Sequence, residues 1–382
     1  MEYRKRLADD VLRDKLEASG AVLVEGAKWC GKTTTSKQIA KSILYMQEPS
    51  QKRQNLLMAD TNPSLLLQGD IPRLIDEWQL APKLWDAVRF EVDQRDDFGQ
   101  FILTGSAVPP DTSEISHSGT GRISRMLMRP MSLLESGESS GSVSLASLFN
   151  ANYNVSASVE SDIEELAFLI CRGGWPKAVG KSVKVALQQA MDYYDAVVNS
   201  DISRVDGKER NPERAKLLMR SYSRNIGTQA KFVEMRQDIL GNDIDSFSID
   251  TLYDYLNALK KIFVIEDAPA WNPNLRSKTA IRNTDTRYFV DPSIATASMG
   301  LGPKDLINDL NTMGLFFENL CVRDLRIYAQ SIGGEIYHYR DRSGLDPPEE
   351  TCSSAVIAVM RWLRVGWEYS SFTRSGDGAT SA

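Results

Sequence analysis

The chain has 382 residues, of which 42% are hydrophobic and 25% charged, which is ordinary for a folded soluble protein but too long for one core. Its formal net charge of -6 excludes a strong basic field, so any contact with nucleic acid would have to be local. No apolar run approaches the ~18 residues of a membrane span, and the first 20 residues are charged throughout. We therefore expect a cytoplasmic protein without membrane contact.

The cysteines give no sign of a metal site. They lie far apart, form no CxxC pair, and are accompanied by only two histidines: Cys30, Cys171, Cys321, Cys352, His117 and His338. Widely spaced cysteines of this kind fit a reducing compartment, and we expect neither structural zinc nor disulfides.

In chain order, the first predicted element is a buried strand at residues 21–24, followed by a glycine-bounded loop and a helical stretch that carries Ile39, Ile43 and Leu44 on one face. A further helix is expected at residues 82–92. Apolar runs that we interpret as strands lie at residues 56–59, 74–75, 101–103 and 126–128. Alternating strands and helices predict an α/β domain with a mostly parallel sheet.

The loop after the first strand matches the pattern GxxxxGK[ST]. It comprises Gly26, Ala27, Lys28, Trp29, Cys30, Gly31, Lys32 and Thr33, with Thr34 next in the helix. The glycines let backbone N–H groups surround a phosphate, Lys32 would neutralise the β- and γ-phosphates, and Thr33 would supply a hydroxyl to Mg²⁺. The alternative is a glycine turn that only joins strand to helix. We predict a P-loop that binds ATP with Mg²⁺.

Two acids end the strand near residue 75, in the sequence Arg-Leu-Ile-Asp-Glu. Asp76 is expected to hold the magnesium shell, and Glu77 to orient and deprotonate the attacking water. Read alone, such a pair could be a helix cap or a solvated turn. After a complete P-loop, it indicates a Walker B strand.

Two more polar positions are candidates for the same site. Thr104 ends the next strand and could act as a polar sensor of the γ-phosphate, although a simple strand-ending turn is the competing interpretation. Arg122 follows a glycine-rich loop and could stabilise charge on the transferring phosphate, within its own chain or across an interface. Arg125 and Arg129 compete for that role.

The rest of the chain is predicted to be mostly helical. A Ser/Gly-rich stretch after residue 135 marks a boundary before a helix at 163–171, and residues 183–225 read as helices. Helices at 232–240 and 248–259, with a strand pair from residue 263, suggest a winged helix. A helix at 315–328 and a strand at 335–340 follow. The expected divisions are 1–150, the ATPase domain; 151–275, helical and winged-helix; 276–345, a C-terminal α+β domain; and 346–382, a divergent and disordered tail.

Several segments in the same order resemble one family. They are AVLVEGAKWCGKTTT, PRLIDEWQLAPKLWDAVR, QFILTGSA, HSGTGRISRMLMRPMSLLESGE, RGGWP, FVDPSIA and GLFFENL, spread from about residue 3 to about residue 345. The chain resembles prokaryotic AAA-type ATPases of largely uncharacterised function, whose C-terminal domain of unknown function is similar to restriction-endonuclease-like folds. The resemblance implies nucleotide binding and hydrolysis, and assembly into homo-oligomers.

The chain departs from that family near its end. Glu318 matches the first acidic position of a nuclease core, but no Glu-x-Lys follows Leu345, where the candidate acids are Asp346, Glu349 and Glu350. Nuclease chemistry needs clustered carboxylates around a metal. The C-terminal domain therefore reads as truncated, and we hypothesise a frameshift, which translation of the gene in its other frames would test.

These features leave several functions open. The leading hypothesis is an ATPase whose nucleotide state moves the appended C-terminal parts, with ATP and ADP as ligands and DNA or a protein as client. The alternatives are a nucleotide-regulated DNA-binding protein with little turnover, a remnant nuclease, or a small-molecule kinase. Residues 201–290 carry 15 Lys and Arg against 13 Asp and Glu, which favours a winged helix used for protein packing over one that binds DNA.

Overall fold

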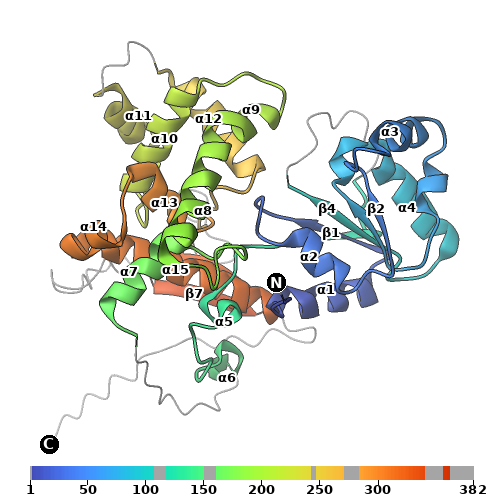
Figure 1. Ribbon diagram of the computed structural model, residues 1–382, viewed down its shortest axis with the longest axis horizontal. Coiled ribbons are helices and arrows are strands. Elements are labelled where there is room, and N and C mark those ends of the chain that lie inside the picture. The colour runs from blue at the N-terminus through green and yellow to red at the C-terminus, as the bar shows by residue number, and fades with distance from the viewer. Residues whose placement is uncertain are drawn as a thin grey trace, which may run out of the picture.

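The computed structural model describes residues 2–106, 118–149, 161–241, 247–270 and 284–339, and the backbone of 356–361. Figure 1 shows an N-terminal part built around a sheet and a second, mostly helical part beside it. None of the helices among these residues is long and apolar enough to cross a membrane.

The N-terminal sheet has five strands, and every pair of neighbours is parallel. They are β1 (Ala21–Glu25), β2 (Ser42–Tyr45), β3 (Arg73–Asp76), β4 (Phe101–Gly105) and β5 (Ile123–Leu127), in the order β2-β3-β4-β1-β5. Strand β4 thus lies between β1 and β3. The register pairs Thr104 with both Val24 and Asp76, so the ends of these three strands meet at one edge.

Apolar side chains cover both faces of this sheet, as expected when helices bury both sides of parallel strands. On one face, Val22 and Ile102 join Leu12 of helix α1 (Leu7–Ala18), with α2 (Lys32–Lys37) beside it. On the other face, Leu23 and Phe101 pack with Trp85 of α4 (Lys83–Arg95), near α3 (Lys52–Thr61). The predicted parallel α/β domain is confirmed.

Two predicted elements of this part are wrong. Residues 42–45, expected in a helix, form β2, because Ile43 and Leu44 pair with β3 at the sheet edge. Residues 56–59, expected as a strand, lie within α3, where Asn55 and Ala59 are buried four residues apart. Short apolar runs fit either period, so the sequence pattern alone could not separate them.

The second part packs around one large hydrophobic cluster. Its helices are α7 (Ile163–Arg172), α8 (Val183–Ala196), a π-helical turn η3 (Val197–Asp201), α9 (Ile202–Arg204), α10 (Pro212–Arg224), α11 (Phe232–Leu240) and α12 (Ile249–Lys261). After α12, two antiparallel bridges join Ile265 with Phe289 and Ala268 with Thr286. The helices predicted at 163–171, 232–240 and 248–259 are confirmed.

The chain continues through three helices and a small sheet. These are α13 (Pro292–Met299), α14 (Pro303–Asn308), α15 (Leu310–Ser331), β6 (Gly334–Tyr339) and β7 (Val356–Arg361), with β6 and β7 antiparallel. Within the tail predicted at residues 346–382, the backbone of 356–361 forms β7, whose N–H and C=O groups pair with those of β6. The other residues of that segment, with Asp346, Glu349 and Glu350, lie outside the described ranges.

Polar contacts join the two parts beneath the sheet. Helix α1 lies against α15. Following β5, Arg129 Nη2 is 2.6 Å from Glu266 Oε1, and the Met131 N–H donates to the Gly174 carbonyl at 2.7 Å. Burial opposes the charge on Glu266, but the Arg129 and Arg326 guanidinium groups lower the pKa of Glu266 to about 2.

Candidate functional site

The loop between β1 and α2 has the backbone that its two glycines permit. Gly26 has φ 146° and Gly31 has φ 106°, both outside the range that L side chains readily adopt. A Cβ at Gly26 would lie 2.0 Å from the Met128 carbonyl oxygen. The Lys32 ammonium donates to the carbonyl oxygens of Gly26 and Ala27, each at 2.8 Å, so it lies inside the loop.

Asp76 is the meeting point of three chain segments. Thr33 Oγ1 at the start of α2 and Thr104 Oγ1 on β4 both donate to Asp76 Oδ1 at 2.7 Å. Asp76 is 3% exposed and Thr104 1%. Thr33, Asp76 and Thr104, which the sequence singled out, therefore lie together. Strand β4, which carries Thr104, has β1 and the loop on one side and β3, which ends in Asp76, on the other.

Glu77, next to Asp76, is held in an uncommon conformation. Its φ is 59°, in the left-handed region that non-glycine residues rarely occupy. Gln79 Nε2 donates to Glu77 Oε2 at 2.5 Å, and Ser106 Oγ lies at the 3.5 Å limit from the same oxygen. A Cβ at Gly105 would lie 2.9 Å from Gln79 Oε1, so Gln79 crosses the end of β4.

Gln79 is a residue of the site that the sequence did not single out. Two residues after the acids, in a short 3-10 turn at Trp78–Leu80, it looks like part of an ordinary turn. With the left-handed backbone at Glu77, the Gln79 side-chain amide points back toward the Glu77 carboxylate. The Glu77–Gln79 spacing was the available signal, and it is a weak one.

Arg122 is not brought to this site within its own chain. Its backbone carbonyl accepts from Ala21 N at the start of β1, and its Nε donates to Asp93 Oδ1 at 2.7 Å. The loop follows the other end of β1, about 15 Å away for a five-residue strand. Within one chain, Arg122 therefore lies at the opposite edge of the sheet from the loop, and its role across an interface stays a prediction. The preceding His117 lies outside the described residues.

The two competing arginines are also engaged elsewhere. Arg125 Nη1 is 3.1 Å from Glu25 Oε1 at the end of β1. Burial raises the pKa of Glu25, and Arg125 opposes that rise. Arg129 is directed to Glu266. Of the two, Arg125 is the one bonded to a residue adjoining the loop.

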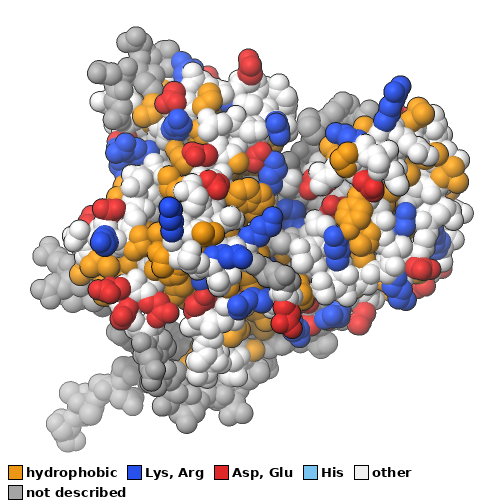
Figure 2. Space-filling model, in the orientation of Figure 1, with side chains coloured by type: hydrophobic (Ala, Val, Ile, Leu, Met, Phe, Trp, Pro, Cys, Tyr) orange, Lys and Arg blue, Asp and Glu red, His pale blue; other side chains and the backbone are white. Residues whose placement is uncertain are grey.

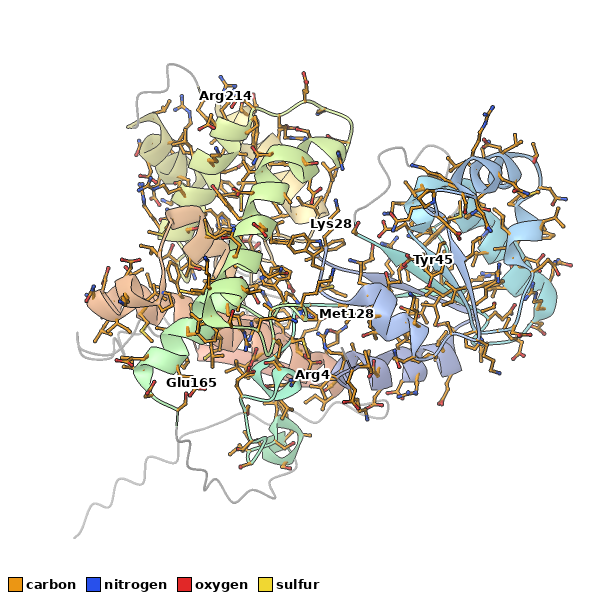
Figure 3. All side chains as sticks on the ribbon, in the orientation of Figure 1. Arg4, Lys28, Tyr45, Met128, Glu165 and Arg214 are labelled. Carbon is orange, nitrogen blue, oxygen red and sulfur yellow. The ribbon has the colours of Figure 1, made fainter. Side chains whose placement is uncertain are left out.

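The remaining loop residues face different surroundings. Cys30 is buried and its Sγ–H donates to the Met128 carbonyl at 3.3 Å, a structural contact. Thr34 is exposed, and its carbonyl accepts from Gln38. Ala27, Lys28 and Trp29 face the helical part: Ala27 is in its hydrophobic cluster, and Lys28 lies between the two parts in Figure 3.

The described residues contain no metal site that would support the nuclease hypothesis. Glu318 on α15 accepts a hydrogen bond from the Tyr288 hydroxyl at 2.5 Å, and burial raises the pKa of this carboxyl. Across the described ranges, no group of three or more His, Cys, Asp or Glu side chains could hold a metal ion.

Comparisons with known proteins match the two parts separately. Residues 18–136 match a family model described as an AAA domain, and residues 163–305 match a domain of unknown function (DUF8612). No curated protein matches the chain. The latter match crosses the predicted boundary at residue 275, and nothing in these comparisons supports a restriction-endonuclease-like fold.

Two solved structures align over most of the chain at low identity. A Walker-type ATPase of Pyrococcus abyssi is 13% identical, with 78% of this chain and 96% of that one covered and a TM-score of 0.46. The ORC1 protein of Aeropyrum pernix, in complex with DNA, is 12% identical, with 81% and 95% covered and a TM-score of 0.27. The AAA domain match, together with the loop and sheet described above, supports an AAA-type P-loop ATPase domain at residues 18–136.

Proposed function

We propose that the protein binds ATP with Mg²⁺ at the loop of residues 26–33 and hydrolyses it. The observation that carries this proposal is the hydrogen-bonded set Thr33–Asp76–Thr104 beside the buried ammonium of Lys32. A lysine, a hydroxyl and a carboxylate at the carboxyl edge of one parallel sheet match the needs of a magnesium-bound triphosphate.

The residues present fit a magnesium ion. Mg²⁺ prefers oxygen ligands and usually keeps several waters, so one hydroxyl and one nearby carboxylate suffice from the protein. Thr33 and Asp76 would hold it, and the Thr104 hydroxyl, which donates to Asp76 Oδ1, keeps the carboxylate in place. The bound ion supplies positive charge against the phosphate oxygens.

The chain's own groups divide the work of hydrolysis. Backbone N–H groups of residues 27–33 and the Lys32 ammonium hold the phosphates. To do so, Lys32 gives up its hydrogen bonds to the Gly26 and Ala27 carbonyl oxygens and donates to phosphate oxygens instead. Glu77 orients the attacking water and accepts its proton on a carboxylate oxygen. Gln79 fixes the direction of that carboxylate.

The second part of the proposal is that nucleotide state moves the appended helical region. Helices α10 to α12 lie within the predicted division at residues 151–275, and the two antiparallel bridges pair Ile265 and Ala268 of that division with Phe289 and Thr286 beyond it; together they are compatible with a winged-helix unit. The loop contacts this region directly through Ala27 and Lys28. A ligand shifts such an arrangement only by the difference in its affinity for the two states, and a contact at the loop itself gives bound nucleotide a way to create that difference.

DNA binding is less well supported than protein packing. On α12, Asp250 is exposed, and Asp254 pairs with Arg210 and Lys208, so the helix presents no run of free basic groups. On the face drawn in Figure 2, Lys and Arg side chains are interspersed with Asp and Glu. Phosphate contacts need clustered basic residues.

The test is Mg²⁺-dependent ATP hydrolysis by the wild type, Glu77→Gln and Lys32→Ala, with ATP binding measured on all three. We expect turnover by the wild type, binding without turnover by Glu77→Gln, and lost binding by Lys32→Ala. A wild type that binds ATP without turnover would leave a nucleotide-dependent switch in place of the ATPase. Equal turnover by wild type and Glu77→Gln would refute the assigned base.

A further inference from the structure

Three consecutive loop residues touch the helical part. Ala27 is fully buried in the same hydrophobic cluster as Trp175 and Tyr193. The Trp29 ring meets Tyr193 edge-on at 5.7 Å between centroids, and Tyr193 stacks on Trp175 at 4.1 Å. Trp29 reaches this position with φ 66°, an uncommon backbone conformation for a non-glycine residue. The phosphate loop is therefore part of the contact between the two parts.

Between Ala27 and Trp29, Lys28 forms an ion pair across that contact. Its Nζ lies 2.5 Å from Asp201 Oδ1 at the end of the π-helical turn η3. The Lys28 side chain is 38% exposed, whereas that of Asp201 is 10% exposed. Among the ion pairs of the described residues, Lys28 is the one cation on Asp201. Single π-turns are frequent where a helix serves a function.

The two lysines of the loop differ in what they must give up to bind phosphate. Lys32 donates to two neutral carbonyl oxygens of its own loop. Lys28 sits between Gly26 and Lys32 in sequence but is neutralised by a carboxylate from another part of the chain. A triphosphate held by the loop carries more negative charge than one carboxylate, so it competes with Asp201 for the Lys28 ammonium.

We propose that Lys28 exchanges Asp201 for the terminal phosphate of bound ATP, and that this exchange releases the helical part from the loop. The proposal rests on the proposed nucleotide site and specifies its regulation. A carboxylate left unpaired in a mostly buried position is unfavourable, so η3 must shift to let water reach Asp201. ADP lacks the terminal phosphate and leaves the Lys28–Asp201 pair in place. The switch thus distinguishes the triphosphate from the diphosphate.

The first experiment measures binding of a non-hydrolysable ATP analogue and of ADP, both with Mg²⁺, to the full chain. We expect Lys28→Met to weaken analogue binding about tenfold and Asp201→Asn to strengthen it several-fold, with ADP affinity changed less than twofold in both. Asp60→Asn, which removes the exposed Asp60–Lys83 pair, is the matched control and should change neither. If the Lys28–Asp201 pair only stabilises the fold, the variants should change the affinities for the analogue and for ADP by the same factor.

A second measurement needs no variant. Hydrogen exchange of the wild type should be faster across residues 197–204 with the analogue than with ADP or without nucleotide. Unchanged exchange, or equal shifts for both nucleotides in the variants, would overturn the switch. If the wild type binds nucleotide and Lys32→Ala does not, but the variant affinities and the hydrogen exchange of residues 197–204 are unchanged, only the switch fails. If the wild type binds neither nucleotide, the proposed function fails and the switch with it.

Discussion

Glu77 and Gln79 are joined by a side-chain hydrogen bond beside the loop. The left-handed backbone at Glu77 costs on the order of 1 kcal/mol and turns its carboxylate toward the Gln79 amide. The amide donates to Oε2 and so restricts how the carboxylate can turn. Positioning by Gln79 is therefore a separate contribution from the basicity of Glu77.

We expect Gln79→Leu to lower the turnover number about tenfold, a fraction of what a general base contributes, and to leave ATP affinity within twofold. The reason is that Gln79 orients Glu77 but bonds to no residue of the loop. Steady-state kinetics with equilibrium binding would separate the two quantities. Gln38→Leu, at the exposed end of α2, is the control. A parallel loss of affinity would contradict a positioning role.

Residues whose chemistry is carried by a local pattern could be predicted, and those defined by tertiary contact could not. Lys32, Thr33 and Asp76 were singled out from the loop motif and from acids at a strand end, and the structure joins Thr33 and Asp76 by a hydrogen bond. Asp201 carries no sequence signal, because its importance arises from a fold that brings it beside residue 28. Gln79 depends on one backbone angle that no pattern specifies.

At the scale of elements, the order of the sheet decides which strand ends meet. Strand β4 lies between β1 and β3, so Thr104 lies beside Asp76. Arg122 comes just before the first residue of β5, at the opposite edge of the sheet. Sequence order alone suggested that the arginine after the glycine-rich loop was near the phosphates. The parallel register of β5 with β1 excludes that within one chain, because both strands begin at the same edge.

Arg122→Ala is accordingly expected to keep hydrolysis within twofold of the wild type at protein concentrations where the chain is monomeric. Its partner Asp93 is exposed to solvent, so the lost pair should cost less than about 1 kcal/mol of stability. Turnover measured across a range of protein concentrations checks the first expectation, and denaturant unfolding of wild type and Arg122→Ala checks the second. A loss above tenfold that appears only on assembly would instead assign Arg122 to a neighbouring subunit, the arrangement left open as a prediction.

The errors in element assignment have a common cause. The segments at 42–45 and 56–59 are each four residues long, with Ile43 and Leu44 as the aliphatic residues of the first, and are too short for their period to distinguish strand from helix. By contrast, α7, α11 and α12 carry longer amphipathic patterns and were predicted correctly. The pairing of β7 with β6 joins segments separated by residues 340–355, and no local pattern reports such a pairing.

Across the whole molecule, the Arg129–Glu266 contact ties the end of β5 to the helical part. The pKa of Glu266 is lowered from 4.5 to about 2, so this carboxylate contributes stability that is complete above pH 4.5 and is lost as the pH falls toward 2. Glu266→Gln should lower the free energy of unfolding by about 2 kcal/mol at pH 7, typical of a hydrogen bond between charged groups.

Denaturant unfolding of wild type and Glu266→Gln between pH 7 and pH 3 would measure this. The difference between them should be constant above pH 5 and shrink below it, because protonation removes the same charge from the wild type. Asp60→Asn, at an exposed pair, provides the reference for the other carboxylates. A difference independent of pH would show that the Glu266 charge is not what joins the two parts.

Calorimetric titration of ATP into the protein, with and without Mg²⁺, measures whether Thr33, Asp76 and Lys32 form a magnesium-dependent ATP site. We expect Mg²⁺ to raise the ATP affinity of the wild type at least tenfold, about 1.4 kcal/mol, and Asp76→Asn to lose this gain while still binding ATP. Equal affinities with and without Mg²⁺ in the wild type, or a full magnesium response in Asp76→Asn, would contradict it.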